Sequence, residues 1–380
     1  MKQGWEYKVF EDCIEKIKYT IKVQRKDFLE YGKYPIISQE KASINGYWNN
    51  IDDLYVIKKP VIIFGDHTQV IKYIDFDFVL GADGVKIIKP KSYLDSLYFY
   101  YYLINLDIRK LGYARHYKLL NGNKIPIPPL TEQQQIVKIL DKAFKGINQA
   151  KENAERSLIN ARELFESYLQ SIFANPNKDW EIKKLGEVCE KITRGQSPKY
   201  LEFNGLCVLN QKCIRDHKIN YNYSRFHDDN IKPIGSDKLI QLGDVLVNST
   251  GTGTLGRVAQ VLETPCKAFV DSHITIVRPI KNVLFYPFFG YVMIYIEDNI
   301  AEIGEGCGGQ TELSRSRLKN EFKISYPKSL TEQQEIVEKL DALSEQTKKL
   351  EKIYEQKLLD LEELNKSLLN KAFNGELTRN

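Results

Sequence analysis

The sequence contains few of the residues on which secreted, membrane-spanning or metal-binding proteins depend. Its six cysteines show no CxxC spacing, and it has only five histidines. This set predicts neither a zinc site nor a disulfide framework, so we expect a reducing compartment. The most apolar stretch, 285–296, is too short to cross a bilayer, and we recognise no signal peptide. These absences favour a cytoplasmic protein over a membrane or secreted one.

The sequence also lacks the motifs of common catalytic sites. It has no GK[ST] phosphate loop and no Asn/Asp-Pro-Pro-Tyr motif of the kind found in amino-methyltransferases. Residues 251–256 satisfy GxGxxG, but residues 257–262 have the pattern of a strand, whereas a dinucleotide site requires a helix there. His67, His116 and His273 have no nucleophile at a recognisable spacing. We therefore expect no catalytic residue, no metal site and no cofactor in this chain.

What the chain does contain is an internal repeat. Residues 130–134, Leu-Thr-Glu-Gln-Gln, recur at 330–334, and the match continues without a gap for about 44 residues at an offset of 200. A looser match relates Trp5-Glu6 to Trp180-Glu181. The repeating unit is thus a globular segment followed by a segment of about 44 residues. Two similar copies of the 44-residue segment, each with its own diverged globular segment, suggest two related recognition surfaces rather than one active site.

Each of the two matching segments predicts one long helix. Thr131 and Gln134 fit a capping box, and Asn-Pro at 175–176 and Asn-Gly at 374–375 are stop signals. Both helices show a heptad seam, mostly large in the second and mostly small in the first. We predict an antiparallel coiled coil that acts as a rigid spacer; two surface helices on separate domains are the alternative. The predicted seams are Leu343, Thr347, Leu350, Tyr354, Lys357, Leu361, Leu364 and Leu368, and Ala143, Ile147, Ala150, Ala154, Ser157, Ala161, Leu164 and Tyr168.

The globular segments predict mixed α/β (α+β) domains, because short strand-like runs precede one aromatic helix in each. We expect the aromatic residues of these helices, 97–106 and 284–296, to form the core rather than to stack on bases. The predicted organisation is a first globular domain at 1–129, a helix at 130–175, a second globular domain at 176–329, a helix at 330–374 and a tail at 375–380.

The net charge of +5 is unevenly distributed along the chain. Residues 1–129 carry 20 basic and 15 acidic side chains, and residues 174–329 carry 21 and 18. The second helix instead has seven basic and ten acidic side chains. The globular domains are therefore mildly basic and the helices are not, a distribution that is compatible with binding nucleic acid through the globular domains.

Polar and basic loops occur at corresponding places in the two globular domains. Arg, Gln, Asn, Thr and His are suited to reading base edges, whereas Lys, Arg and Ser commonly hold phosphates. Each loop taken alone is more often a solvated turn, but recurrence in both domains favours a shared role. The candidate DNA-binding residues are Lys41, Thr68, Gln69, Arg115, His116, Lys118, Arg194, Gln196, Lys199, Gln211, Lys212, Thr250, Thr252, Arg257, Gln310, Thr311, Arg315 and Arg317.

The chain resembles the specificity subunits of type I restriction–modification enzymes. The resemblance rests on the two Thr-Glu-Gln-Gln helices and on the approaches to them, Ile125 to Leu130 and Leu318 to Pro327. Trp180 with Leu185-Gly186-Glu187, and Gly81 to Val85, add to it. It covers essentially the whole chain in the order recognition domain, helix, recognition domain, helix. The first domain departs from the pattern, because the segment after Trp5 lacks the Leu-Gly-Glu of the second.

The resemblance implies a subunit without catalysis of its own. Each target-recognition domain would read one half of a bipartite, asymmetric site in double-stranded DNA, and the helical spacer would set the gap. Two methyltransferase subunits, and motor-endonuclease subunits in the full complex, would be its partners in a prokaryotic cytoplasm, at the nucleoid. S-adenosylmethionine, ATP and Mg²⁺ would be bound by those partners.

The same resemblance places methyltransferase-facing residues around the helices. A helix-capping role is the alternative for these residues. For the whole chain, the alternative is a non-catalytic scaffold with two protein-interaction domains on a coiled coil. The candidate partner-binding residues are Glu132, Gln133, Gln134, Glu332, Gln333 and Gln334.

Overall fold

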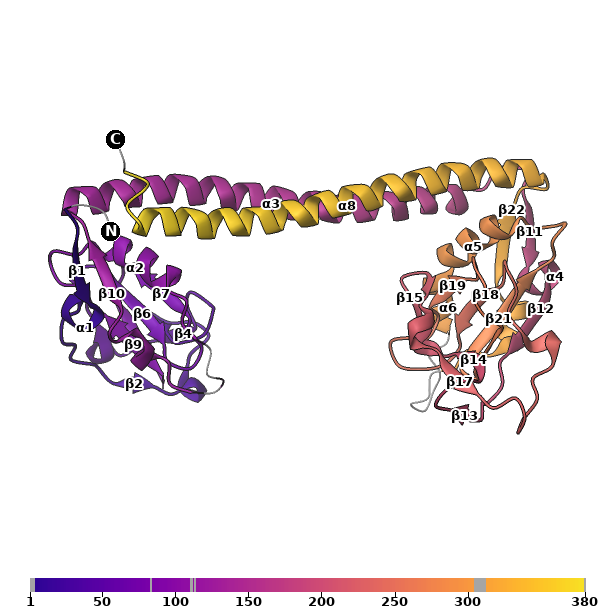
Figure 1. Cartoon of the computed structure of the whole chain (residues 1–380), viewed down its shortest axis with the longest axis horizontal. Helices are drawn as coiled ribbons and strands as arrows, with labels where there is room; N and C mark the ends of the chain where they lie inside the picture. The colour runs from indigo at the N-terminus through magenta and orange to yellow at the C-terminus, as the bar shows by residue number, and fades with distance from the viewer. Residues whose placement is uncertain (1–3, 83, 110–111, 113, 304–311, 379–380) are drawn as a thin grey trace. The chain divides into compact units, whose positions relative to one another are not determined.

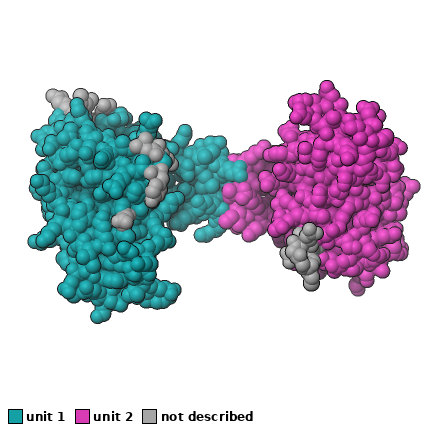
Figure 2. Space-filling view, turned by 90° about the horizontal axis from the view of Figure 1, so that it is seen from below, with its two compact units in different colours: residues 1–156, 354–380 teal, residues 157–353 magenta. Residues whose placement is uncertain are grey.

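A computed structural model describes residues 4–82, 84–109, 112, 114–303 and 312–378. Two globular heads accompany two long helices, α3 (Leu130–Ala174) and α8 (Leu330–Phe373) (Figure 1). The chain forms two compact units, residues 1–156 with 354–380, and residues 157–353 (Figure 2). Each unit therefore combines one head with the first part of one long helix and the last part of the other.

The first head has a three-stranded antiparallel sheet, a larger mixed sheet and a two-stranded ribbon that leads into α3. The three-stranded sheet has the order β7 (Ile71–Ile74), β6 (Val61–Gly65), β9 (Val85–Ile88). The mixed sheet has the order β2 (Lys22–Val23), β8 (Phe78–Gly81), β3 (Tyr34–Ile37), β4 (Gly46–Trp48), with β5 (Leu54–Tyr55) also paired to β8. The ribbon is β1 (Glu6–Val9) with β10 (Lys124–Ile127), and the helices are α1 (Phe10–Cys13) and α2 (Ser96–Asn105).

The second head contains corresponding elements and a further hairpin. Its ribbon is β11 (Glu181–Lys184) with β22 (Lys323–Tyr326), and one sheet has the order β12 (Cys189–Arg194), β21 (Ile274–Pro279), β18 (Val245–Asn248), β19 (Val258–Gln260). The other sheet has the order β13 (Tyr200–Leu201), β17 (Arg225–His227), β14 (Leu206–Leu209), β20 (Ala268–Val270), and β15 (Ile214–Arg215) pairs with β16 (Lys218–Ile219). The helices are α4 (Leu185–Val188), α5 (Tyr286–Tyr295), α6 (Glu297–Ile303) and α7 (Arg315–Asn320).

The duplication extends into the sheets of the heads. In both, the central strand, β6 or β18, is fully buried and pairs antiparallel with its two neighbours. In both, a parallel pair, β3 with β8 or β14 with β20, lies in the second sheet. The mixed architecture predicted from the sequence is therefore confirmed.

Helix α2 shows how the first head is attached to the long helices. Asp95 caps α2 by accepting hydrogen bonds from the backbone N–H groups of Leu97 and Tyr98. The side chain of Tyr98 is fully buried, and its ring lies 5.3 Å from that of Phe373 near the end of α8, in an edge-on contact. The aromatic residues of this helix thus belong to the core, as predicted.

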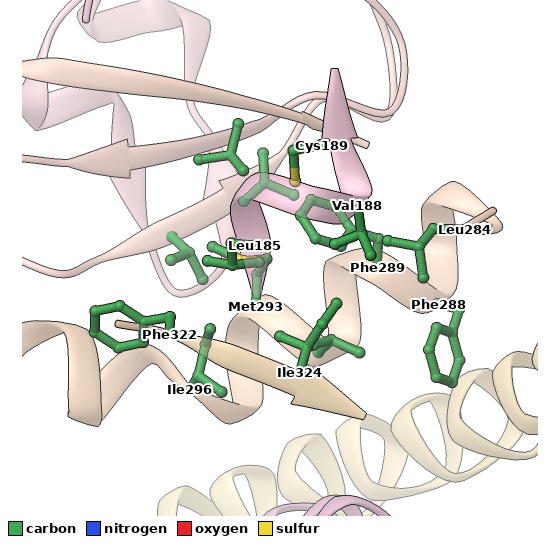
Figure 3. Close-up of a cluster of buried hydrophobic side chains, with 14 of the residues drawn as sticks. Leu185, Val188, Cys189, Leu284, Phe288, Phe289, Met293, Ile296, Phe322 and Ile324 are labelled. Carbon is green, nitrogen blue, oxygen red and sulfur yellow. The ribbon is translucent and has the colours of Figure 1, made fainter. Parts of the chain in front are cut away.

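The second head is attached in the same way. The ring of Phe288 on α5 lies 5.5 Å from that of Phe173 at the end of α3. Figure 3 shows Phe288 directed toward the long helices, at the edge of the cluster that also holds Leu185, Phe289 and Ile324. The core of each head thus includes residues from both long helices, so each head packs directly against the helix pair.

The long helices run antiparallel within each unit. In the first unit Lys151 pairs with Glu362, and in the second Arg162 pairs with Glu351, so a step forward along α3 corresponds to a step back along α8. Small residues of α3, Ala154 and Ala161, are buried in the contact. Two long packed helices are therefore confirmed, and small residues of α3 contribute to the contact between them.

The phase of the predicted seam is wrong at one position of α3 and at three positions of α8. Leu164, Leu350 and Leu364 are 49%, 37% and 46% exposed, and the exposed Lys357 also lies outside the contact. At each of these four places the inward residue is the next one along the chain. The seven-residue repeat is kept, but its three-residue and four-residue steps follow in the opposite order. Sequence alone does not determine this phase, because apolar residues occur on both faces of α8. The residues that are less exposed than the predicted ones are Phe165 on α3, and Glu351, Leu358 and Asn365 on α8.

The ends of the helices also differ in part from the prediction. Helix α3 begins at Leu130, so Thr131 lies inside the first turn and does not form the predicted capping box. In α8 the hydroxyl of Ser329 accepts a hydrogen bond from the backbone N–H of Glu332 at 3.4 Å. The predicted stop after α8 is confirmed, because Gly375 follows the helix with φ of 75°.

Candidate nucleic-acid interface

The loops of the first head meet at the end of its central strand. Here the Thr68 hydroxyl donates to the backbone carbonyl of Gln39 at 2.6 Å, and the backbone N–H of His67 donates to Gln39 Oε1 at 3.2 Å. The amide of Gln69 reaches the carbonyl of Arg109 at 3.3 Å. Of the candidate residues, Lys41, Thr68 and Arg115 are exposed, and Gln69 is half-buried. We name Gln39, Lys41, Thr68, Gln69 and Arg115 the first loop cluster.

Asp66, which is buried next to this cluster, holds the segment that carries Arg115. Its side chain accepts a hydrogen bond from the backbone N–H of Tyr117 at 2.8 Å, and its carbonyl accepts one from the backbone N–H of His116 at 2.7 Å. The ring of His116 also contacts that carbonyl and is only 2% exposed. His116 therefore holds the loop in place, and Arg115 beside it is the side chain that reaches solvent.

A buried lysine closes the loop that carries Lys41. Lys72 on β7 donates to the carbonyl of Ala42 at 2.5 Å and to Asn45 Oδ1 at 3.0 Å. Asn45 Oδ1 also accepts the backbone N–H of Ser38 at 2.8 Å. Burial lowers the pKa of Lys72 to about 8. The loop is thus fixed at both ends by groups that sequence reasoning did not identify.

The second head forms a similar cluster around Thr250. The amide nitrogen of Gln211 donates to the Thr250 carbonyl at 2.8 Å and to its hydroxyl at 2.5 Å. That hydroxyl lies 2.8 Å from Nδ1 of His273, which is exposed. Arg194 forms an ion pair with Glu312 and donates to the carbonyl of Leu313 at 2.9 Å. We name Arg194, Gln211, Thr250, His273 and Glu312 the second loop cluster.

The two clusters occupy corresponding points of the two heads. The last bond of each hairpin runs from Gly65 N–H to the Val70 carbonyl in one head and from Asn248 N–H to the Arg257 carbonyl in the other. A later segment returns to the same point, where Leu313 N–H bonds to the Ser249 carbonyl much as His116 N–H bonds to that of Asp66. The recurrence of these loops, inferred from the sequence, therefore has a structural basis.

Sequence reasoning missed Gln39, His273 and Glu312 as members of these clusters. Gln39 is the second residue after β3, and Gln211 is the second residue after β14, so the two glutamines correspond. Residues 36–39, Ile-Ile-Ser-Gln, and 208–211, Val-Leu-Asn-Gln, share an apolar pair, a small polar residue and glutamine. That pattern could have identified Gln39 once the strands had been aligned.

The remaining candidate residues are less closely associated. Arg257 donates to the Gly253 carbonyl at 2.7 Å, and Gln196 is half-buried near β20, where its N–H bonds to the Val270 carbonyl at 3.2 Å. Arg317 pairs with Glu321 and bonds to the Ile303 carbonyl at 3.0 Å. Gln310 and Thr311 lie outside the described residues. The side chains of Lys118, Lys199, Lys212, Thr252 and Arg315 are exposed.

Two of the candidate partner-binding glutamines, Gln133 and Gln333, have a structural role. Gln133 is fully buried; its Oε1 accepts the backbone N–H of Asp95 at 2.7 Å, and its Nε2 donates to the carbonyls of Tyr93 and Pro128. Gln333 makes the same three bonds in the second head, with the backbone N–H of Phe285 at 2.7 Å as its donor. Each glutamine thus joins a head to the start of a long helix.

The neighbouring glutamates belong to the same joint. Glu132 accepts the indole N–H of Trp5 at 3.0 Å, and Glu332 accepts that of Trp180 at 3.1 Å. Of the six candidate partner-binding residues, Gln134 and Gln334 present exposed side chains. The repeated sequence therefore encodes a head-to-helix joint, and the capping box is not what the motif forms in α3.

One further hydrogen bond completes each joint. The Tyr101 hydroxyl donates to Asp141 in the first unit, and the Tyr291 hydroxyl donates to Asp341 at 2.5 Å in the second. Burial and the neighbouring carboxylate raise the pKa of both tyrosines above the ordinary range, so both hydroxyls remain protonated donors.

Neither a metal centre nor a membrane span occurs in the described part of the chain. Among those residues, no group of three or more His, Cys, Asp and Glu side chains is arranged to hold a metal ion. No helix within the same ranges is both long and apolar enough to cross a membrane.

Comparison with known proteins relates this chain to one family. The family model for the Type I restriction modification DNA specificity domain matches residues 2–156 and 177–359. The Escherichia coli protein "Type I restriction enzyme EcoR124I/EcoR124II specificity subunit" is 26% identical over 342 residues, which span 85% of this chain and 82% of that protein. A putative type I restriction enzyme MjaX specificity subunit of Methanocaldococcus jannaschii is 25% identical over 424 residues, with 99% and 94% covered.

Solved structures show a similar fold. A chain from a structure concerned with complex assembly and conformational transition of the type I R-M system has 19% identity and a TM-score of 0.77 over 99% of both chains. The crystal structure of the HsdS subunit from Thermoanaerobacter tengcongensis has 19% identity and a TM-score of 0.61, with 99% of this chain and 98% of that chain covered.

Proposed function

Because the chain belongs to the type I restriction–modification DNA specificity family, we propose that it is the non-catalytic subunit that selects the DNA target of such a complex. Each head reads one half of a bipartite, asymmetric target in double-stranded DNA. The pair of long helices sets the gap between the two halves and docks methyltransferase subunits.

The observation that carries this proposal is the correspondence between the two loop clusters. The same strand ends present Gln39, Thr68 and Arg115 in one head, and Gln211 and His273 in the other. Side chains that donate and accept hydrogen bonds discriminate base pairs by their pattern. Corresponding positions with different side chains suit two half-sites of different sequence.

The partners follow from the same proposal. Two methyltransferase subunits complete the modification enzyme, and motor-endonuclease subunits join it for restriction. Those partners bind S-adenosylmethionine, ATP and Mg²⁺, while this subunit binds no cofactor and performs no catalysis. The complex acts in a prokaryotic cytoplasm, on DNA of the nucleoid.

The first prediction concerns the salt dependence of DNA binding. We expect affinity for a random-sequence duplex to fall at least about a hundredfold between about 50 and 200 mM salt, because phosphate contacts release counterions. Fluorescence anisotropy with the intact chain, alone and with its methyltransferase partner, measures this slope. Replacing the exposed Lys41 or Lys212 by Gln should reduce the slope by about one each.

Lys339 on α8 provides the matched control, because it is exposed but lies outside both heads. Lys339→Gln should leave the slope unchanged. An affinity that does not depend on salt would contradict DNA binding and would favour the alternative of a scaffold with two protein-interaction heads.

A further inference from the structure

The orientation of the Gln211 amide is fixed by a backbone carbonyl. The carbonyl oxygen of Thr250 can only accept a hydrogen bond, and it lies 2.8 Å from the end of the Gln211 side chain. The NH₂ group of Gln211 must therefore face Thr250. Its second hydrogen reaches the Thr250 hydroxyl, 2.5 Å away.

This arrangement leaves the hydroxyl hydrogen of Thr250 free to bond to His273. Because the Thr250 hydroxyl accepts from Gln211, its own hydrogen remains available, and Nδ1 of His273 lies 2.8 Å away. A neutral imidazole has one nitrogen that accepts and one that donates. If Nδ1 accepts from Thr250, the proton of the ring is on Nε2.

The backbone of His273 is held as firmly as its ring. Its N–H donates to Asp271 Oδ1 at 2.9 Å, and its carbonyl accepts the backbone N–H of Ser249 at 2.8 Å. Burial raises the pKa of Asp271, which is 4% exposed. The His273 side chain itself is exposed, and among the described residues no hydrogen bond engages Nε2. With Nδ1 accepting from Thr250, the ring presents one oriented N–H donor to solvent.

The corresponding position of the first head carries a different group. Gly84 precedes β9 as His273 precedes β21, and its φ is +86°. A Cβ at Gly84 would lie 2.5 Å from Oε1 of Gln39, so this glutamine occupies the space that a side chain would need. The two heads therefore offer different hydrogen-bonding groups at the same structural position.

We infer that His273 reads a base edge in the half-site of the second head, as a donor from Nε2 to an acceptor such as N7 or O6 of a purine. Gln211 and Thr250 are positioning residues that fix the tautomer. This inference rests on the proposed function. A base rather than a phosphate is the ligand because a single oriented N–H supplies direction, and the nearby Arg194 is already paired with Glu312.

Selection from a library of random duplexes tests this inference, with the intact chain in its methyltransferase complex. The wild-type protein should enrich a motif of two separated halves. His273→Ala should reduce the preference at one base pair of one half by up to about tenfold, as expected for a single hydrogen bond, and leave the other half unchanged.

Variants of Thr250 separate positioning from a general structural effect. Thr250→Val keeps the shape but removes the hydroxyl, so it should relax the same base pair as His273→Ala. Thr250→Ser keeps the hydroxyl and should retain the wild-type motif. Thermal unfolding by circular dichroism shows whether each variant is folded. If His273→Ala does not fold, the comparison of Thr250→Val with Thr250→Ser still tests the role of His273.

The outcomes are distinct. A wild-type motif that persists in His273→Ala or in Thr250→Val overturns the role of His273 and leaves the proposed function intact. Equal weakening on all sequences overturns it too, because that result indicates a phosphate contact. A wild-type protein that selects no motif overturns the proposed function itself.

Discussion

At the scale of single residues, the duplicated glutamines show how a short motif can be misread from sequence. Gln133 and Gln333 occur in a pattern typical of a helix start, so a capping box was the natural interpretation. Two of the three partners of each glutamine, on the segments that precede α2 and α5, lie about 40 to 50 residues away along the chain. No local pattern predicts such bonds, because only the folded head brings these groups together.

The second prediction follows from this joint. Replacing Gln333 by Leu leaves one backbone N–H and two carbonyls of the joint without partners, so we expect the free energy of unfolding of that unit to fall by about 3 kcal/mol. Hydrogen exchange at the backbone N–H of Phe285 reports the loss directly.

Gln334→Leu is the matched control, because its side chain is exposed and one position further along the same helix. It should change stability by no more than about 0.5 kcal/mol. Equal protection of Phe285 in the two variants would contradict the structural role of Gln333.

At the scale of elements, the sequence predicts the two long helices almost to their ends but not their facing sides. The repeat length and the absence of proline are local properties, and they determine where each helix runs. Which of two adjacent stripes packs inward depends on the partner helix, and exposed residues such as Leu350 and Leu364 made the wrong stripe look apolar.

For the loops, too, the sequence predicts the local property but not the long-range contacts. Their positions between strands were predicted correctly, because polar residues punctuate apolar runs. Their bonds to one another, such as that of Gln39 to Thr68, depend on which strands pair, and a parallel pair has no local signal.

The third prediction concerns the spacer. Insertion of seven residues after Gly146 in α3, together with seven at the opposed position near Ser367 in α8, keeps the seam in phase in both helices. Each helix lengthens by about 10.5 Å, close to three base pairs of DNA at about 3.4 Å each. Methylation mapping in cells should show a gap about three base pairs longer and two unchanged half-sites.

An insertion in α3 alone is the control. Gly146 is exposed, and a Cβ at this position would have no neighbouring atom within 4 Å outside its own stretch of helix, so the site itself tolerates change. The unmatched insertion shifts α3 against α8 and should destabilise the protein. A matched insertion that leaves the gap unchanged, or alters either half-site, would contradict the spacer hypothesis.

At the scale of the whole molecule, each head has its own core, sheets and loop cluster, and each is attached to the helices through the same joint. The sequence reveals this duplication, because the repeat is visible in the helices. It does not reveal the recognised bases, since these depend on where loop side chains such as Arg115 are placed.

The fourth prediction is that the two heads read independently. Arg115→Ala removes an exposed guanidinium of the first loop cluster, so it should weaken discrimination at one position of the first half-site by about 1–3 kcal/mol. Methylation mapping of the variant measures this.

Arg315→Ala is the matched variant in the second head, where the side chain is likewise exposed. It should leave the half-site affected by Arg115→Ala untouched. Relaxation of both halves by a single substitution would show that the heads are coupled.

The division of the chain into its two units has a consequence for biosynthesis. The second unit, residues 157–353, is one continuous stretch, whereas the core of the first also needs Leu369 and Phe373 from the end of α8. Domains usually fold in the order in which the ribosome releases them. Here the head that is translated first completes its core last, so the nascent first head must wait, with part of its apolar surface uncovered, until α8 has emerged.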